Sequence, residues 1–327
     1  MNIPNIKGQK GKDTPLKNGV AATGALVIPC LVPELNSFFQ FFMPGAAAAF
    51  LNSGSIRRGF MVLLAVYILG STLFLATGMV ASALILAQAS VICGGLLIAA
   101  WKAIEAPKTL LVLTLSVICM SAIIMVVASG LEIQEVYSKM ISAMTNEYDK
   151  AVELYKKNVN EPLPVQLDQL IIDIKRTLIA YFPGIVSSFF IFLSLSNIIT
   201  FSKLNQIKGL ERNLKPEFDR WRLPWWLVWV FILFGFMAII PEGIWPDIGK
   251  NGVLILCVFY LIQGFSIMRF FFKVMDTPIY IRYLVYALIG IQWYGLLLVV
   301  FTGLMDNWFD FRTRLEKKMA SKEDNQS

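Results

Sequence analysis

The stretch that decides the fold is residues 59–101, GFMVLLAVYILGSTLFLATGMVASALILAQASVICGGLLIAAW, which holds no charged side chain. Crossing about 30 Å of hydrocarbon takes about 20 mostly apolar residues in a helix, because only a helix pairs its own backbone groups there. This stretch is therefore long enough for two spans, which we assign to residues 59–77 and 79–101. The sequence predicts an integral membrane protein of the all-α class.

The composition of the whole chain supports this prediction. Of its 327 residues 57% are apolar and 16% are charged, and the mean hydropathy is +0.64. Soluble domains are about 45–50% apolar and about 25% charged, so an ordinary soluble enzyme is excluded. Together with the two spans above, seven further apolar segments predict a polytopic helical transmembrane bundle of eight or nine segments: 19–34, 36–54, 109–131, 177–202, 223–241, 250–272 and 282–305.

The first two of these segments are interrupted by prolines, so we leave open whether they span the membrane or are re-entrant. Lysine and arginine gather in alternate loops, which places the amino terminus in the cytoplasm. The expected organisation has five parts: a basic cytoplasmic terminus (1–18), the first five membrane segments (19–131), an extracytoplasmic helical insertion (132–176), the last four membrane segments (177–305) and a polar tail (306–327).

The side of the membrane that holds the carboxyl terminus is left open. Nine crossings would leave the tail outside the cell. Four of its cations favour the cytoplasm instead: Arg312, Arg314, Lys317 and Lys318.

The insertion at 132–176 is the longest polar stretch. Its apolar residues recur at helical spacing from Ile133 to Tyr155, and Pro162 and Pro164 then interrupt it. This pattern predicts an amphipathic helical hairpin on the outer face. It would either cap the bundle or lie in the headgroups, or it would act as a lid over a substrate cavity.

The sequence does not favour catalysis. It contains no histidine, no nucleophile elbow and no phosphate-binding glycine loop, and its four cysteines all lie within apolar stretches. We therefore expect no enzyme, no cofactor and no metal. The net charge of +7 suits anionic lipid headgroups better than nucleic acid, because no basic soluble domain is present.

Polar side chains inside apolar spans are the default functional candidates, since each needs a partner or a wet cavity. Glu34, Asn36 and Gln88 form a candidate ligand pocket that opens outward. A second group is expected to make intramembrane polar contacts between helices: Asn197, Gln263 and Gln292. The small residues Ala21 and Ala25 share one helix face, which suits either internal packing or docking of a partner helix.

Two distinctive motifs flank the last spans. The first is LKPEFDRWRLPWWLVW (Leu214–Trp229), and the second is MDNWFDFR (Met305–Arg312). Arginine and tryptophan beside a span are typical of the membrane interface. We therefore expect Asp310 to pair with Arg314 one turn on, and eight residues to act as interface anchors: Arg220, Trp221, Arg222, Trp225, Trp226, Trp308, Asp310 and Arg312.

With these two motifs, the proline-broken start and the middle insertion, the chain resembles the YybS-like family of uncharacterised bacterial membrane proteins along nearly its whole length. That family has no established activity. More distantly, the first six segments look like the substrate-binding membrane components of energy-coupling-factor transporters. This second resemblance implies a six-helix fold with an outward-facing pocket, although the last three spans and the insertion depart from it.

Two functions are carried forward, both in the bacterial cytoplasmic (inner) membrane. The first is a substrate-binding or permease-like transport component for a small solute. The alternative is a structural or assembly subunit of a membrane protein complex. The expected partners are the lipid bilayer, other membrane proteins and a small-molecule ligand.

Overall fold

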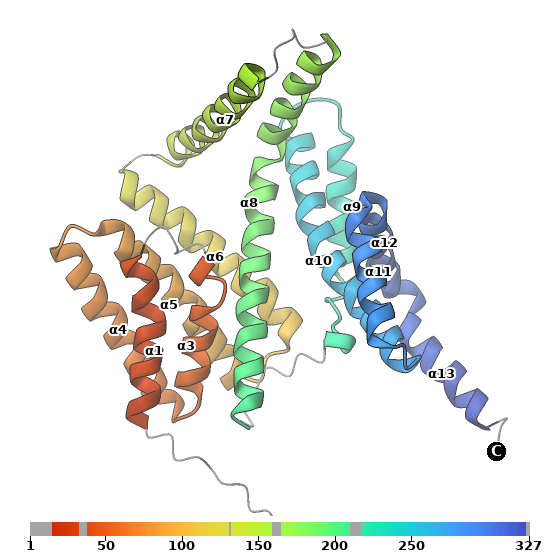
Figure 1. Ribbon diagram of the computed structural model, residues 1–327, viewed down its shortest axis with the longest axis horizontal. Coiled ribbons are helices and arrows are strands. Elements are labelled where there is room, and N and C mark those ends of the chain that lie inside the picture. Colours follow the sequence, from red (N-terminus) through yellow and green to blue (C-terminus); the bar gives the residue numbers. More distant parts are fainter. Residues whose placement is uncertain (1–14, 33–37, 131, 159–164, 210–217, 325–327) are drawn as a thin grey trace, which may run out of the picture. The chain divides into compact units, whose positions relative to one another are not determined.

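The computed structural model describes residues 15–32, 38–130, 132–158, 165–209 and 218–324, and every regular element in these ranges is a helix (Figure 1). The helices are α1 (Pro15–Leu31), α3 (Met43–Asn52), α4 (Ile56–Ala76), α5 (Val80–Trp101), α6 (Ala106–Ser129), α7 (Ile133–Asn158), α8 (Val165–Ile207), η1 (Phe218–Arg220), α9 (Leu227–Ala238), α10 (Trp245–Val274), α11 (Ile279–Ile291), α12 (Trp293–Phe309) and α13 (Phe311–Asp324).

The chain forms two compact units. Unit 1 consists of Met1–Ile104 and Ser196–Leu214, and unit 2 consists of Glu105–Leu195 and Lys215–Ser327. Helix α8 contributes its last three turns to unit 1 and the rest of its length to unit 2.

Unit 1 is built from α1, α3, α4, α5 and the end of α8. The uncharged stretch 59–101 forms α4 and α5, which are joined by a tight turn in which Gly78 has a φ of +76°. The two helices run antiparallel, since Gly94 lies against Leu63 and Gly70 lies against Leu86. Small side chains fill the core between α1, α3 and α5, so backbones approach closely, as is usual in membrane helix packing: Ala22, Ala47, Ala48 and Ala49 are fully buried.

Unit 2 is built around α10, which packs against α9 and α12. At the crossing of α10 and α12, Gly264 and Gly303 lie against backbone atoms of the facing helix, and a Cβ at either position would overlap them. Glycine is therefore required at this crossing. The hairpin of α7 and the start of α8 is closed by a Tyr148 hydroxyl that donates to the Ile171 carbonyl at 2.8 Å.

Five described helices are long and apolar enough to cross a membrane: α4, α5, α6, α8 and α10. The bent pair α11 and α12, which turns by 108°, gives a sixth if it is counted as one span. The all-helical membrane class is confirmed, whereas the finer figure of eight or nine segments stays a prediction. The predicted segments 19–34, 36–54 and 223–241 correspond to the shorter helices α1, α3 and α9, and segment 282–305 is interrupted at Gln292.

Candidate functional site

Three amides buried among the described residues share one arrangement. Each side-chain oxygen accepts a hydrogen bond from a backbone N–H beside a proline, and each side-chain nitrogen donates to a backbone carbonyl in another segment. The three residues are Asn197, Asn251 and Gln263. Proline has no backbone N–H and disturbs the backbone hydrogen bonds around it. The N–H and C=O groups near a proline therefore need hydrogen-bond partners from other segments. We call these contacts amide bridges.

The bridge in unit 1 is made by Asn197 on α8. Its Oδ1 accepts from the Gly45 N–H at 2.7 Å, directly after Pro44, and its Nδ2 donates to the Gln40 carbonyl at 2.8 Å. A Cβ at Gly45 would lie 2.5 Å from the Asn197 carbonyl oxygen, so glycine is needed for this approach. The interhelical contact expected for Asn197 is present.

Unit 2 contains the other two bridges. The Gln263 Oε1 accepts from the Leu223 N–H, just before Pro224, and its Nε2 donates to the Gly303 carbonyl, both at 2.9 Å. The Asn251 Oδ1 accepts from the Gly184 N–H at 2.7 Å, directly after Pro183.

The Asn251 bridge supplies hydrogen-bond partners to α8 at the turn that contains Pro183. Its Nδ2 donates to the Ala180 carbonyl at 2.8 Å, and Ala180 and Gly184 carry the two groups that an uninterrupted helix would join to each other. Sequence reasoning missed Asn251. The signal that could have found it is the disturbance that Pro183 causes inside a span, which needs a polar side chain from a neighbouring helix.

The two distinctive motifs meet in unit 2 at Arg312. Its Nη2 donates to the Trp221 carbonyl at 2.8 Å and to the Ser266 hydroxyl at 3.2 Å. The same nitrogen lies 3.8 Å from a carboxylate oxygen of Asp306, and both side chains are at least 95% buried. Burying a charge without a partner is very costly, so this contact ties the start of α13 firmly to the first motif.

Further ion pairs surround this contact. Lys273 Nζ lies 2.7 Å from Asp219 Oδ2, and Arg222 pairs with Asp310. The expected pair of Asp310 with Arg314 is therefore wrong: Asp310 reaches the first motif, while Arg314 lies over the Phe309 ring. Since Asp310 adopts the left-handed conformation at the end of α12, the chain turns there before α13 begins.

The charged groups of this network lower the pKa values of two of its carboxyls, Asp219 and Asp310. Burial raises the pKa of Asp219, but the bond from Lys273 and the charges of Lys273 and Arg269 outweigh it and hold the pKa below its usual value. A hydrogen bond with Thr313, followed by the Arg222 guanidinium, lowers the pKa of Asp310. Both carboxylates are thus kept ionised by their neighbours.

These contacts bear on the open question of the tail. Helix α11 begins directly after α10, close to Lys273, and Asp310 at the end of α12 pairs with Arg222 at this same end of unit 2. The bent pair therefore starts and finishes at one end of the unit. The tail therefore begins at the same end of unit 2 as residues 218–222.

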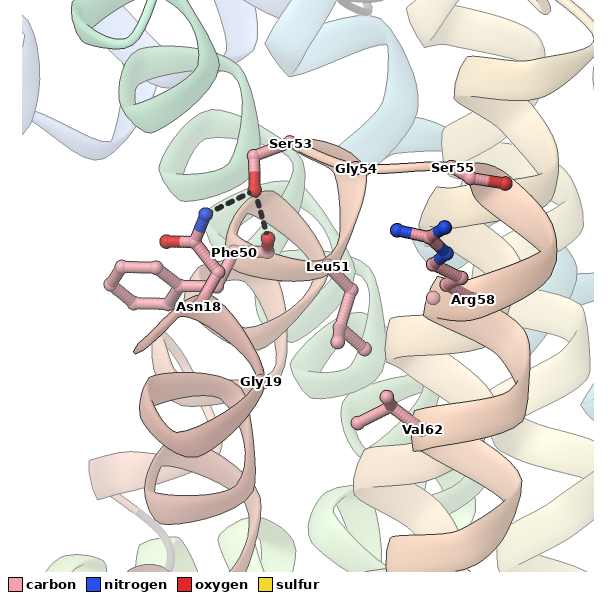
Figure 2. Close-up of a pocket in the computed structure, with 10 residues that line it drawn as sticks. Asn18, Gly19, Phe50, Leu51, Ser53, Gly54, Ser55, Arg58 and Val62 are labelled. Carbon is pink, nitrogen blue, oxygen red and sulfur yellow. Dashed lines mark hydrogen bonds between the residues drawn. The ribbon is translucent and has the colours of Figure 1, made fainter. Parts of the chain in front are cut away.

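Unit 1 has a small pocket of about 70 Å³ that opens to the surface. Its rim carries polar side chains of Asn18, Ser53, Ser55 and Arg58, and its floor is apolar, with Leu51 and Val62. Figure 2 shows Arg58 projecting from α4 toward the turn that holds Ser53 and Gly54. The Asn18 amide donates to the Ser53 hydroxyl at 2.7 Å, and that hydroxyl donates to the Phe50 carbonyl at 2.6 Å.

The remaining predicted residues are distributed over both units. Glu34 and Asn36 lie outside the described residues, and Gln88 is half-buried on α5. Ala25 is buried and Ala21 half-buried on α1, which packs within unit 1. Gln292 is exposed at the break between α11 and α12.

The expected interface anchors divide into two groups. Trp221 and Arg312 are buried, whereas we expected both among the headgroups. The two residues contact each other inside unit 2, where the Arg312 guanidinium donates to the Trp221 carbonyl. The others are exposed or partly so: Arg220, Arg222, Trp225, Trp226, Trp308 and Asp310. Among the described residues no group of histidine, cysteine, aspartate or glutamate is placed to hold a metal ion.

Comparison with known proteins yields one family. The model of a family described as predicted membrane protein (DUF2232) matches residues 21–307 of the chain. No curated protein and no solved structure matches significantly.

Proposed function

The chain belongs to this family of predicted membrane proteins, and we propose that it is a structural or assembly subunit of a membrane protein complex. The observation that carries this proposal is helix α7. It is amphipathic, it is not among the candidate spans, and it leaves large apolar side chains exposed, such as Tyr137, Leu154 and Tyr155. An exposed apolar face of this kind suits contact with another protein.

The amide bridges support the same proposal. A solute pathway needs polar side chains that are free to face a cavity. The amides of these residues are not free in this way. Asn197, Asn251 and Gln263 each accept from a backbone N–H beside a proline and donate to a backbone carbonyl. Their hydrogen bonds join helices to each other, which suits a structural subunit. In this proposal the α7–α8 hairpin stands on the outer face of the bacterial inner membrane, where it meets the partner.

The test is photo-crosslinking in native membranes. A photoreactive amino acid replaces Leu154, which is 62% exposed on the hairpin, and the matched control replaces Leu69, which is 69% exposed on the span α4. We expect a stoichiometric protein adduct from position 154 and mainly lipid adducts from position 69. A protein that purifies alone and forms no protein adduct from position 154 would contradict the proposal.

A second proposal is the substrate-binding or permease-like component. The pocket in unit 1 supports it, because a hollow with hydrogen-bonding groups on its rim can hold a small solute. In this case a panel of vitamins and related solutes should raise the unfolding temperature of the purified protein. A panel in which no compound raises that temperature argues for the scaffold instead.

A further inference from the structure

Unit 1 has an unusual distribution of charge. Its described residues, 15–32, 38–104 and 196–209, contain no aspartate and no glutamate, but they contain six cations. The cations are Lys17, Arg57, Arg58, Lys102, Lys203 and Lys208. The described part of unit 1 therefore carries a net positive charge, which favours the approach of anions.

The six cations lie toward one end of unit 1. Helix α1 begins there, because Asn18 is hydrogen-bonded to Ser53, which follows α3 and precedes α4. Helix α5 runs antiparallel to α4 and returns Lys102 to this end. The last turns of α8 follow α3 from Gly45 to Phe50, where Lys208 Nζ lies 3.9 Å from the ring centroid.

The pocket of Figure 2 opens at the same end. Arg58 supplies a guanidinium, which matches phosphate oxygens in geometry and charge. The Ser55 hydroxyl and the second N–H of the Asn18 amide can donate to the same oxygens, and no side chain caps the first turn of α4. Below this polar rim, the floor of Leu51 and Val62 is apolar. A polar rim above an apolar floor fits an amphiphile that has a negatively charged head.

We propose that this pocket is a binding site for a phosphate group, supplied by the headgroup of an anionic phospholipid. The phosphate lies against Arg58 and the hydroxyl-bearing turn, and the start of an acyl chain covers the apolar floor. The bound phosphate thus places a negative charge beside Arg58 at the basic end of the unit. This inference is independent of the proposed assembly role.

The basic end could instead reflect topology alone, since cations on the cytoplasmic side orient a membrane protein without any specific site. The two explanations differ in what they require of individual residues. Diffuse attraction treats all six cations alike, whereas a site depends on Arg58, which lines the pocket, more than on Lys102, which does not.

The experiment measures bound lipid by native mass spectrometry of the full chain, released from nanodiscs that contain phosphatidylglycerol and phosphatidylcholine. For Arg58→Gln we expect about a five-fold loss of retained phosphatidylglycerol, which corresponds to about 1 kcal/mol for one basic residue at a membrane surface. The matched control Lys102→Gln removes the same charge and should lose less than two-fold, which is roughly the change expected from screened long-range attraction.

A second arm separates the sources of phosphate. Inorganic phosphate is titrated onto wild-type and Arg58→Gln protein in nanodiscs made of phosphatidylcholine alone. Binding that depends on Arg58 in this arm assigns the site to a soluble phosphate compound, which overturns the lipid assignment. Retention of phosphatidylglycerol without such binding supports the lipid.

A second variant tests the same site independently, in case Arg58→Gln misfolds. Val62→Phe fills the apolar floor and leaves every charge in place, so it should also lower phosphatidylglycerol retention several-fold. Equal losses in Arg58→Gln and Lys102→Gln, together with unchanged retention in Val62→Phe, would overturn the proposal. Helical content and a monodisperse elution profile establish folding for each variant.

Discussion

The two units of this protein differ in whether carboxylates lie beside their described cations. In unit 2 three cations around the two distinctive motifs meet carboxylates of the same unit: Lys273 meets Asp219, Arg222 meets Asp310 and Arg312 meets Asp306. In unit 1 six cations share a described region without a single carboxylate. These ion pairs stabilise the fold of unit 2, whereas we propose that Arg58 of unit 1 binds an anionic lipid. Substitutions that remove one cation from each unit can test this difference.

The largest effect is expected from Arg312→Met. This change leaves the buried Asp306 without its cation and the Trp221 carbonyl without its donor, and breaking a buried pair in this way costs about 3–5 kcal/mol. Unfolding in detergent, followed by tryptophan fluorescence, measures the loss.

The control for this prediction is Arg57→Gln in unit 1. Arg57 is exposed, so its removal should leave the unfolding transition unchanged. The double variant Asp306→Asn with Arg312→Met should recover part of the loss. An Arg312→Met protein that unfolds like the wild type would remove the distinction between the units.

The next effect sharpens the comparison by testing a feature that both units share. Gln263→Ala in unit 2 and Asn197→Ala in unit 1 each leave a backbone N–H and a carbonyl without their partners, which costs about 1–3 kcal/mol. The exposed Gln292→Ala serves as the matched control and should change stability little. If either bridge variant matched this control, the role of the amides beside prolines would be refuted.

A smaller effect concerns salt. Raising sodium chloride from about 50 mM to about 500 mM shortens the screening length more than two-fold. Phosphatidylglycerol retention by the exposed cations of unit 1 should then fall, whereas the unfolding transition set by the buried Arg312 should hold. Native mass spectrometry of bound phosphatidylglycerol and thermal unfolding, each at both salt concentrations, provide the two readouts. Equal salt sensitivity of both readouts would speak against the contrast.

The smallest expected effect concerns pH. The pKa of Asp219 is lower in the folded protein than its usual value of about 3.9, so its ionised form stabilises the fold above that value. This contribution is lost as the pH falls through the folded-state pKa. Unfolding measured between about pH 6 and pH 3 should therefore be less pH-dependent in Asp219→Asn than in the wild type. An unchanged slope would show that Lys273 does not stabilise this carboxylate.

The helices could be predicted from local sequence, and their mutual contacts could not. Residues 59–101 predict two helices because the stretch is uncharged and twice the length of a span, and α4 and α5 follow that prediction. The segment 282–305 reads as one continuous apolar run, but the structure breaks it at Gln292, which adopts an extended conformation. No apolar periodicity marks such a break.

The polar contacts show the same limit. Asn197 and Gln263 stand out as amides within spans, and interhelical bonding could be predicted for them. Their partners could not, because Gly45 lies 152 residues from Asn197. Arg312 reads as a surface cation after the last span, yet it is buried because the Trp221 carbonyl and Ser266 lie within its reach. Burial of a charge depends on such distant partners rather than on neighbours in sequence.

The length of α8 has a mechanical consequence. Its 43 residues extend about 65 Å, whereas a bilayer with its headgroups is about 40–45 Å thick. In the orientation that we propose, an upright α8 forms a stalk that carries the α7 hairpin roughly 20 Å clear of the membrane surface. The Asn251 bridge stiffens this stalk at the turn where Pro183 would otherwise let it flex. A binding partner need not touch the bilayer to be reached.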